Sequence, residues 1–257
     1  MPHPLSMSNT RETHMNTHLS TYILLDRSAS MAGSRWENAI SSINTYLDTL
    51  SEECKGSNQT ANITVITFDS GHTNFRPQNA QALNGVNTKP IWGSSQGNVR
   101  GILNNTTPGS TNSFDIIRNN IAVDTINRLN IDEVRPRGGT PLYESISKMI
   151  DLAHSNNNEK TVLLVVTDGE ENSSGMEFTG NMVKNKIAEC EKRGWEVLFL
   201  GAEFNADYTA HTLGVMPSKV INTNDSADLG QSMSFYASAS MSYTRGLNID
   251  TTMMRNK

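Results

Sequence analysis

The chain has 257 residues, of which 21 are basic and 26 acidic, so its net charge is −5, and only 18% of its residues are charged. Its length suits one large α/β domain or two small ones, and this low charge excludes disorder driven by charge repulsion. A net negative chain lacks a global positive field for nucleic acid, so we expect no nucleic-acid partner.

The apolar runs and the cysteines of the sequence indicate where in the cell the protein is made. The longest aliphatic run, 162–166, is far shorter than the roughly 20 residues of a membrane helix, so we expect no membrane insertion. No apolar signal-peptide core stands near the N-terminus, and the two cysteines, Cys54 and Cys190, do not form a disulfide framework. We therefore expect two free thiols and synthesis in the cytoplasm.

The first half of the chain begins with a polar stretch, and we expect residues 1–20 to form a flexible tail. A short apolar strand then ends at Asp26. Further on, apolar residues recur at spacings of four and three, which predicts one face of a helix over 36–50. Residues 63–68 are rich in β-branched side chains and predict a second strand.

A polar segment interrupts this pattern at about 70–113, where Asn, Gly, Thr, Ser and Gln dominate. Loops longer than about 12–15 residues are uncommon, so we interpret the segment as an insertion, either a functional loop or a disordered one. Residues 114–117 predict a strand that returns beside 63–68.

In the second half, apolar patterns alternate between helical and strand-like. They predict helices at 142–153, 182–190, 205–212 and 229–241, and strands at 162–167, 195–200 and 219–221. Gly194 is expected to end the second of these helices and Asp225 to cap the last. Alternation of this kind predicts a doubly wound, mostly parallel α/β sheet with helices on both faces, in one domain over 21–245 with a C-terminal tail at 246–257.

Oxygen-bearing side chains stand where these predicted strands end. Asp26, Ser28 and Ser30 follow the first strand, Thr140 precedes a helix, and Asp168 follows the strand at 162–167. Ligands of open α/β sheets bind at the carboxyl ends of the strands. Because carboxylates and hydroxyls are the ligands that hard cations take, the residues predict a site for Mg²⁺.

Three flanking residues have a physical reason to be there. Gly138 and Gly139 allow the unusual backbone that a ligand loop needs, and Pro141 suits the first helical position. We expect Glu170 and Glu171 to be solvated or to surround the metal site without binding the metal.

Three stretches carry a resemblance: Asp-Arg-Ser-Ala-Ser at 26–30, Gly-Gly-Thr-Pro-Leu at 138–142 and Thr-Asp-Gly at 167–169. In this order they resemble the metal-ion-dependent adhesion site of von Willebrand factor type A domains, over roughly 21–245. Ala29 stands where glycine is common in the family. The stretches look most like stand-alone members of bacteria and their phages.

The resemblance implies a Rossmann-like six-stranded sheet of order 3-2-1-4-5-6, with the second and third strands antiparallel. It also implies that Asp26, Ser28, Ser30, Thr140 and Asp168 hold one Mg²⁺ or Mn²⁺, some through water. In the family, an acidic side chain of a partner protein completes the metal's coordination. An adhesion-type protein-binding module is therefore the function we expect.

Other functions remain open at this stage. The chain resembles phage members, so one alternative is a virion component of head, neck or tail that binds other phage structural proteins. A second alternative is a metal-dependent hydrolase, but no His, Lys or Cys stands within a few residues of a ligand to serve as base or nucleophile. Residues 93–97 match the esterase pattern G-x-S-x-G but lie in the polar insertion rather than between a strand and a helix. We therefore expect no enzyme and no catalytic residues.

Overall fold

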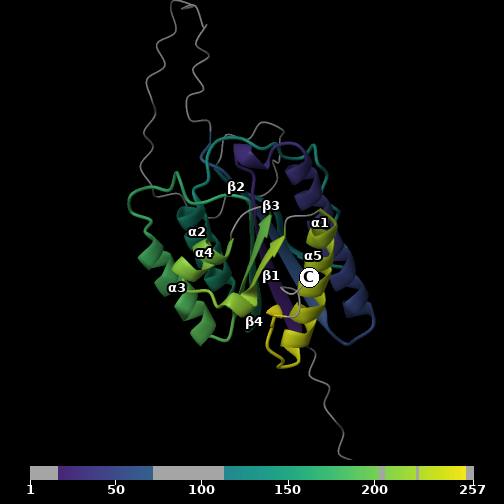
Figure 1. The fold of residues 1–257 in the computed structure, drawn as a ribbon. Helices are drawn as coiled ribbons and strands as arrows, with labels where there is room; N and C mark the ends of the chain where they lie inside the picture. Colours follow the sequence, from purple (N-terminus) through teal and green to yellow (C-terminus); the bar gives the residue numbers. More distant parts are fainter. Residues whose placement is uncertain (1–16, 72–112, 203–205, 224–225, 253–257) are drawn as a thin grey trace, which may run out of the picture.

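A six-stranded sheet forms the middle layer of the protein (Figure 1). The computed structural model describes residues 17–71, 113–202, 206–223 and 226–252. The strands lie in the order β3-β2-β1-β4-β5-β6, and all neighbours are parallel except β2 and β3. The predicted fold class and strand order are therefore confirmed. The strands are β1 (His18–Asp26), β2 (Thr60–Phe68), β3 (Phe114–Ala122), β4 (Lys160–Thr167), β5 (Glu196–Ala202) and β6 (Val220–Thr223).

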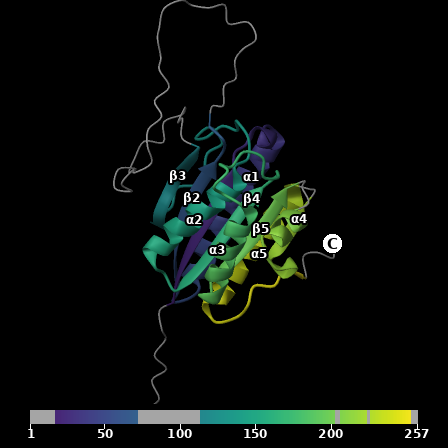
Figure 2. The same cartoon turned by 90° about the vertical axis from the view of Figure 1, so that its left-hand side faces the viewer.

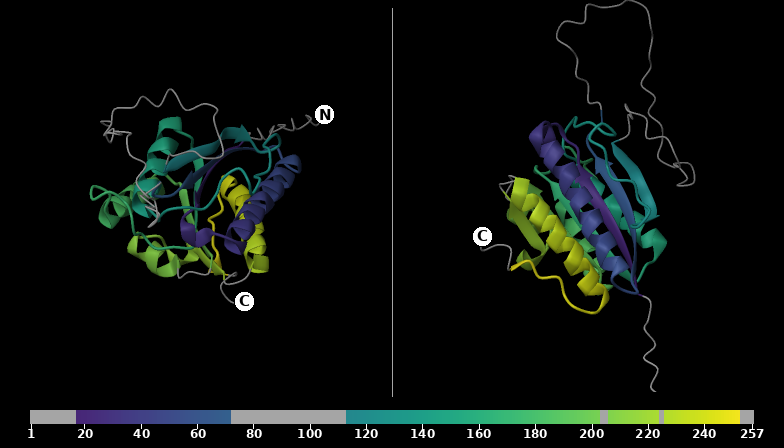
Figure 3. Two further views of the ribbon diagram at one scale, coloured as in Figure 1. Left: turned by 90° about the horizontal axis from the view of Figure 1, so that it is seen from above. Right: turned by 90° about the vertical axis from the view of Figure 1, so that its right-hand side faces the viewer.

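Helices cover both faces of the sheet, as Figures 2 and 3 show. The pair α1 and α5 packs on one face, and α2 and α3 pack on the other with α4 beside them. The helical segments are η1 (Ala29–Met31), α1 (Ser34–Lys55), α2 (Leu142–Asn156), α3 (Gly180–Lys192), α4 (Ala206–Thr212), η3 (Pro217–Lys219) and α5 (Ser226–Thr244).

The central strand β1 shows why this layering forms. Leu19, Ile23 and Leu25 join the core under α1 and α5, whereas Tyr22 and Leu24 join the core under α2 and α3. Successive side chains of a strand point to opposite faces, so a strand with apolar side chains on both faces needs cover on both. The last residue of β1 is the buried Asp26, the first residue of the candidate site described below.

Both ends of the domain lie further out than the sequence analysis expected. β1 begins at His18, where the pairing with Thr60 starts, so the tail ends before this residue. The expected C-terminal tail is wrong for residues 249–251. Ile249 is buried in the core beside α5, and the buried Thr251 hydroxyl donates to the backbone oxygen of Ser218 at 2.8 Å.

Several sequence expectations fall outside the described residues. These are residues 1–16 of the tail, most of the insertion, the G-x-S-x-G match and the cap at Asp225. The two roots of the insertion are described and lie together, because the backbone N–H of Asp69 donates to the oxygen of Ser113 at 2.9 Å. Among the described helices, none has the length and apolar composition needed to cross a membrane.

Both cysteines are free thiols, as expected. Cys190 lies buried on α3, and burial raises the pKa of its thiol to about 12. It is therefore protonated at neutral pH and packs as a small apolar side chain.

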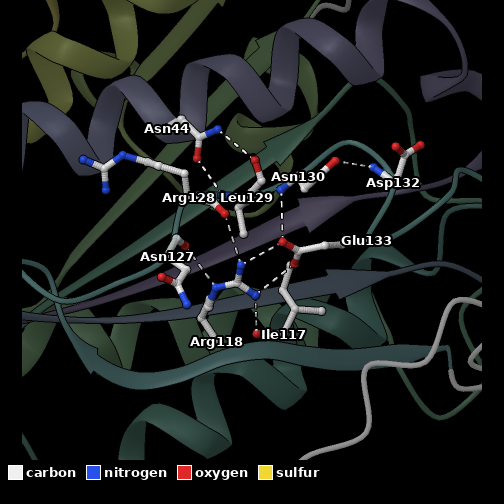
Figure 4. Close-up of polar contacts among 9 residues, drawn as sticks. All are labelled: Asn44, Ile117, Arg118, Asn127, Arg128, Leu129, Asn130, Asp132 and Glu133. Atoms are coloured by element: carbon white, nitrogen blue, oxygen red, sulfur yellow. Dashed lines mark hydrogen bonds and ion pairs between the residues drawn. The ribbon is translucent and has the colours of Figure 1, made fainter.

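Hydrogen bonds hold the connection between β3 and α2 in place (Figure 4). The guanidinium of Arg118, on β3, forms a two-point ion pair with Glu133, with both N–O distances at 2.9 Å. It also donates to the backbone oxygen of Asn127 at 3.2 Å. Asn44 of α1 accepts from the backbone N–H of Leu129 at 2.8 Å and donates to its oxygen at 3.0 Å. The connection is thus fixed to β3 and α1 before it reaches the Gly-Gly-Thr loop.

Candidate metal site

The predicted ligands gather at the edge of the sheet where β1 and β4 end, which the left panel of Figure 3 views from above. Asp26 is the last residue of β1, and Asp168 follows the last residue of β4. Ser28 precedes the short helix η1, and Ser30 lies in it. Thr140 lies just before Pro141, which occupies the N-cap position of α2. Pro141 was expected inside the helix and lies one position before it.

Oxygens from two segments of the chain lie near one point beside Gly169. A methyl group in place of its α-hydrogen would lie 3.2 Å from Thr140 Oγ1 and 3.8 Å from both Asp26 Oδ2 and Ser30 Oγ. The oxygens of Asp26, Ser30 and Thr140 therefore lie within 4 Å of one point, and a side chain at position 169 would crowd Thr140.

Direct hydrogen bonds join the remaining predicted ligands to this group. The hydroxyl oxygens of Ser28 and Ser30 are 2.9 Å apart, and Ser30 donates to Asp168 Oδ1 at 2.8 Å. The side chain of Asp168 is only 1% exposed, and Ser28 is buried, whereas Ser30 is exposed. The structure thus brings all the predicted ligands together in one cluster, and Ser30 is its solvent-exposed member.

Asp26 is fully buried, and both of its carboxylate oxygens accept hydrogen bonds. Oδ1 accepts from the backbone N–H of Ser28 at 2.7 Å, and Oδ2 accepts from the Thr167 hydroxyl at 2.6 Å. Burial raises the pKa of Asp26 from 3.8 to about 6, although these hydrogen bonds oppose the shift, and the nearby charge of Asp168 adds to it. The metal-free site is thus costly to ionise, and a bound cation would relieve that cost.

The Gly-Gly-Thr loop is tightly fixed by its neighbours. Gly138 has a φ of +66°, and a Cβ there would lie 2.7 Å from Ser70 Oγ. A Cβ on Gly139 would lie 2.8 Å from Asn172 Oδ1. Gly138 is therefore required for its backbone conformation, as expected, and a side chain at Gly139 would displace the side chains of Asn172 and Ser173. Asn172 Oδ1 accepts from the backbone N–H of Thr140 at 2.7 Å and holds the threonine in place.

Glu171 has a structural role at this edge. Its Oε2 accepts from the backbone N–H of Tyr143, in the first turn of α2, at 2.7 Å. Its Oε1 accepts from the backbone N–H groups of Ser173 and Ser174 at 2.9 and 2.7 Å. A carboxylate at a helix N-terminus satisfies open N–H donors and favours the helix dipole. Glu171 therefore caps α2 from another loop and fixes the helix behind Thr140, while Glu170 is exposed.

We expect Glu171→Ala to destabilise the protein by about 1–2 kcal/mol, since a capping carboxylate is lost from α2. The exposed neighbour provides the matched control, and Glu170→Ala should change the free energy of unfolding by less than about 0.5 kcal/mol. Urea denaturation measures both values. Equal effects of the two variants would contradict the capping role.

Sequence reasoning missed a buried ionic network next to Asp26. Arg27 is 2% exposed, and its Nε pairs with the fully buried Asp69. Arg27 Nη1 lies 2.7 Å from Asp115, and Arg137 Nε lies 2.9 Å from Asp69. Backbone bonds add to it: Arg137 N–H donates to the Arg27 oxygen at 2.8 Å. This network, Arg27–Asp69–Asp115–Arg137, ties the loop after β1 to the Gly-Gly-Thr loop and to both roots of the insertion.

The donor set fits a hard divalent cation. Hydroxyl and carboxylate oxygens are the ligands of Mg²⁺ and Mn²⁺, and three of them lie within 4 Å of one point beside Gly169. In the described ranges no three His, Cys, Asp or Glu side chains come together as a metal cluster. The candidate site contains only two such residues, Asp26 and Asp168, and its remaining donors are hydroxyls.

Comparison with solved structures identifies the fold. The pilus adhesin SpaC from Lactobacillus rhamnosus GG matches with a TM-score of 0.57 at 12% identity, over 89% of this chain and 31% of that one. The PilB minor pilin from Streptococcus sanguinis matches with 0.53 at 12% identity, over 91% and 63%. A von Willebrand factor type A protein from Catenulispora acidiphila matches with 0.51 at 13% identity, over 88% and 43%.

These matches give the chain the von Willebrand factor type A fold, as the motifs predicted. The chain spans between 31% and 63% of the length of these three structures. No family model and no curated protein matches the sequence.

Proposed function

We propose that the chain is a protein-binding module that depends on Mg²⁺ or Mn²⁺, in which an acidic side chain of the partner completes the metal's coordination. The observation that carries this proposal is that oxygens of Asp26, Ser30 and Thr140 lie within 4 Å of one point beside Gly169. Ser28 and Asp168 join them through hydrogen bonds. Two of the similar structures are a pilus adhesin and a minor pilin, which agrees with a role in protein interaction.

Charge explains why the partner's group should be a carboxylate. The hydroxyls of Ser28, Ser30 and Thr140 are neutral ligands, so Asp26 and Asp168 supply all the negative charge among the proposed ligands. A divalent cation held mainly by neutral oxygens remains a strong electrophile for an anionic oxygen. Asp or Glu of a partner supplies the missing ligand through an anionic oxygen.

We propose binding rather than catalysis, because no His, Lys or Cys stands within a few residues of a proposed ligand to act as general base or nucleophile. Hydrolysis at a metal needs such a group held close to the reacting water. Hydrolysis of ester or phosphate substrates that disappears in the Asp26→Ala variant would overturn this part of the proposal. A place in a virion stays a prediction from motif resemblance.

Metal binding is tested by replacing a hydroxyl with a methyl group. In calorimetry with MnCl₂, the wild type should bind one ion per chain, and Thr140→Val should bind it about ten- to hundredfold more weakly, since one ligand to the cation is lost. Thr161→Val is the matched control, because Thr161 is another buried threonine at the start of β4, away from the ligands. Its affinity should equal that of the wild type.

The carboxylate preference is tested with two short peptides that differ only in Asp or Asn. Relaxation of water protons by protein-bound Mn²⁺ reports whether a peptide displaces metal-bound water. We expect displacement by the Asp peptide and none by the Asn peptide. No bound Mn²⁺ in the wild type would sink the whole proposal, whereas bound Mn²⁺ with equal responses to both peptides would sink only the carboxylate partner.

A further inference from the structure

Arg35 brings a cation to the edge of the candidate metal site. It lies in the first turn of α1, and the turn before it contains Gly33 with a φ of +83°. Its Nη1 lies 3.2 Å from Asp168 Oδ2 and 3.1 Å from the backbone oxygen of Ser30. The Arg35 side chain is 39% exposed, while that of Asp168 is 1% exposed. The guanidinium therefore touches a buried proposed ligand and also reaches solvent.

This contact places Arg35 on the carboxylate that the metal would use. Asp168 Oδ1 accepts from the Ser30 hydroxyl at 2.8 Å, and Oδ2 accepts from Arg35. A divalent cation bound in this cluster would share Asp168 with the guanidinium. Two cations on one carboxylate repel each other, so the ion pair and the metal oppose each other.

The same charge has the opposite effect on an incoming carboxylate. A guanidinium binds carboxylates through a planar fork of N–H donors, and an anion placed at the metal would lie near it. Attraction between the two would add to the metal–oxygen bond. A site with Arg35 should therefore hold the metal less tightly and the anion more tightly than a site without it.

We propose that Arg35 determines ligand preference at this site: it weakens binding of the cation and strengthens binding of the partner's carboxylate once the cation is present. This inference rests on the proposed function and names a residue that the ligand motif does not contain. Arg35 would couple metal binding to carboxylate binding. A cation that binds Asp168 would weaken the Arg35–Asp168 ion pair, and the guanidinium could then bind the partner's carboxylate.

The test compares Arg35→Gln with Arg245→Gln. Arg245 is an exposed arginine directly after α5, so the control loses the same charge away from the site. Calorimetry with MnCl₂ measures metal affinity, and water-proton relaxation with acetate measures carboxylate binding to the Mn²⁺-loaded protein. We expect Arg35→Gln to bind Mn²⁺ about three- to tenfold more tightly and acetate about three- to tenfold more weakly. Arg245→Gln should match the wild type in both.

Arg35→Lys separates charge from geometry. It keeps the positive charge but not the fork, so its Mn²⁺ affinity should stay within about twofold of the wild type while its acetate affinity falls. Thermal unfolding followed by circular dichroism checks that each variant is folded.

The outcomes distinguish the inference from its foundation. Opposite shifts for metal and acetate in Arg35→Gln support it. Shifts in the same direction would indicate a purely structural role for Arg35 and overturn it, as would affinities equal to those of the wild type. If the wild type binds no Mn²⁺, the proposed function fails first, and this inference fails with it.

Discussion

Replacing Asp26 by asparagine should abolish metal binding and at the same time stabilise the metal-free protein above pH 6. Asparagine keeps the size of the side chain and an oxygen that can accept from Ser28 N–H, but it carries no charge. In the wild type, burial raises the pKa of Asp26 from 3.8 to about 6. That difference corresponds to about 3 kcal/mol, which the metal-free fold loses when the buried carboxyl ionises.

The sign of the pH dependence follows from this raised pKa. The folded state holds the Asp26 proton more tightly than the unfolded state does. The stability that this group contributes is therefore complete below about pH 4 and is lost as the pH rises through about 6. Urea denaturation in EDTA at several pH values should show the wild type falling by up to about 3 kcal/mol relative to Asp26→Asn between pH 4 and 7.

Added metal should largely close the gap in stability between the two proteins. Mn²⁺ at 100 times its dissociation constant stabilises a protein that binds it by about 2.7 kcal/mol, so the wild type should gain this amount and Asp26→Asn nothing. Asp151→Asn is the surface control, because Asp151 is an exposed acid on α2, and it should follow the wild type at every pH. A wild type and an Asp26→Asn variant that respond equally to Mn²⁺ would refute the role of Asp26.

The positions of the proposed ligands could be predicted from the sequence because simple rules fix them. Apolar runs that end at Asp26 and Asp168 mark the ends of β1 and β4, and neighbouring parallel strands end at the same edge. The two glycines before Thr140 indicate a loop with unusual backbone, and Gly138 does have a positive φ. Periodicity and turn chemistry thus predicted where the proposed ligands lie without any knowledge of distant contacts.

The supporting contacts could not be predicted, because each joins residues that no local pattern connects. Arg27 looks like a spacer inside Asp-Arg-Ser-Ala-Ser, yet it is buried against Asp69, which lies 42 residues further along the chain. Asn172 and Glu171 look like polar loop residues but bind Thr140 and the start of α2. A buried charge is recognised only once its partner is known, and pairing depends on the folded chain.

The domain's C-terminal end was missed for a related reason. Ile249 and Thr251 stand in a short polar stretch without periodicity, so the sequence indicated a tail. In the structure both are buried, and Thr251 N–H donates to the backbone oxygen of Ser218 at 2.7 Å. Single buried residues of this kind form no periodic pattern in the sequence. Their burial becomes visible only when the surface they pack against is known.

Asp69→Ala should destabilise the metal-free protein by about 3–5 kcal/mol, the largest effect on stability that we expect from a single substitution here. Asp69 is fully buried and accepts from Arg27, Arg137 and the backbone N–H of Gly71. Removing it leaves two guanidinium groups in a buried place with Asp115 as the remaining acid of the network. An uncompensated buried charge costs far more than the net value of the pair that held it.

Urea denaturation in EDTA measures this cost without any contribution from metal. Asp115→Ala is the control, because it removes the other acid of the network. Asp115 contacts Arg27, and its side chain is 13% exposed. We therefore expect Asp115→Ala to lower the free energy of unfolding by less than Asp69→Ala does. The double variant Asp69→Ala, Arg137→Ala should be less destabilised than the sum of its single variants, since the second change removes one of the stranded charges. Strict additivity, or a cost of Asp69→Ala below about 1 kcal/mol, would show that this network does not hold the metal-site loops together.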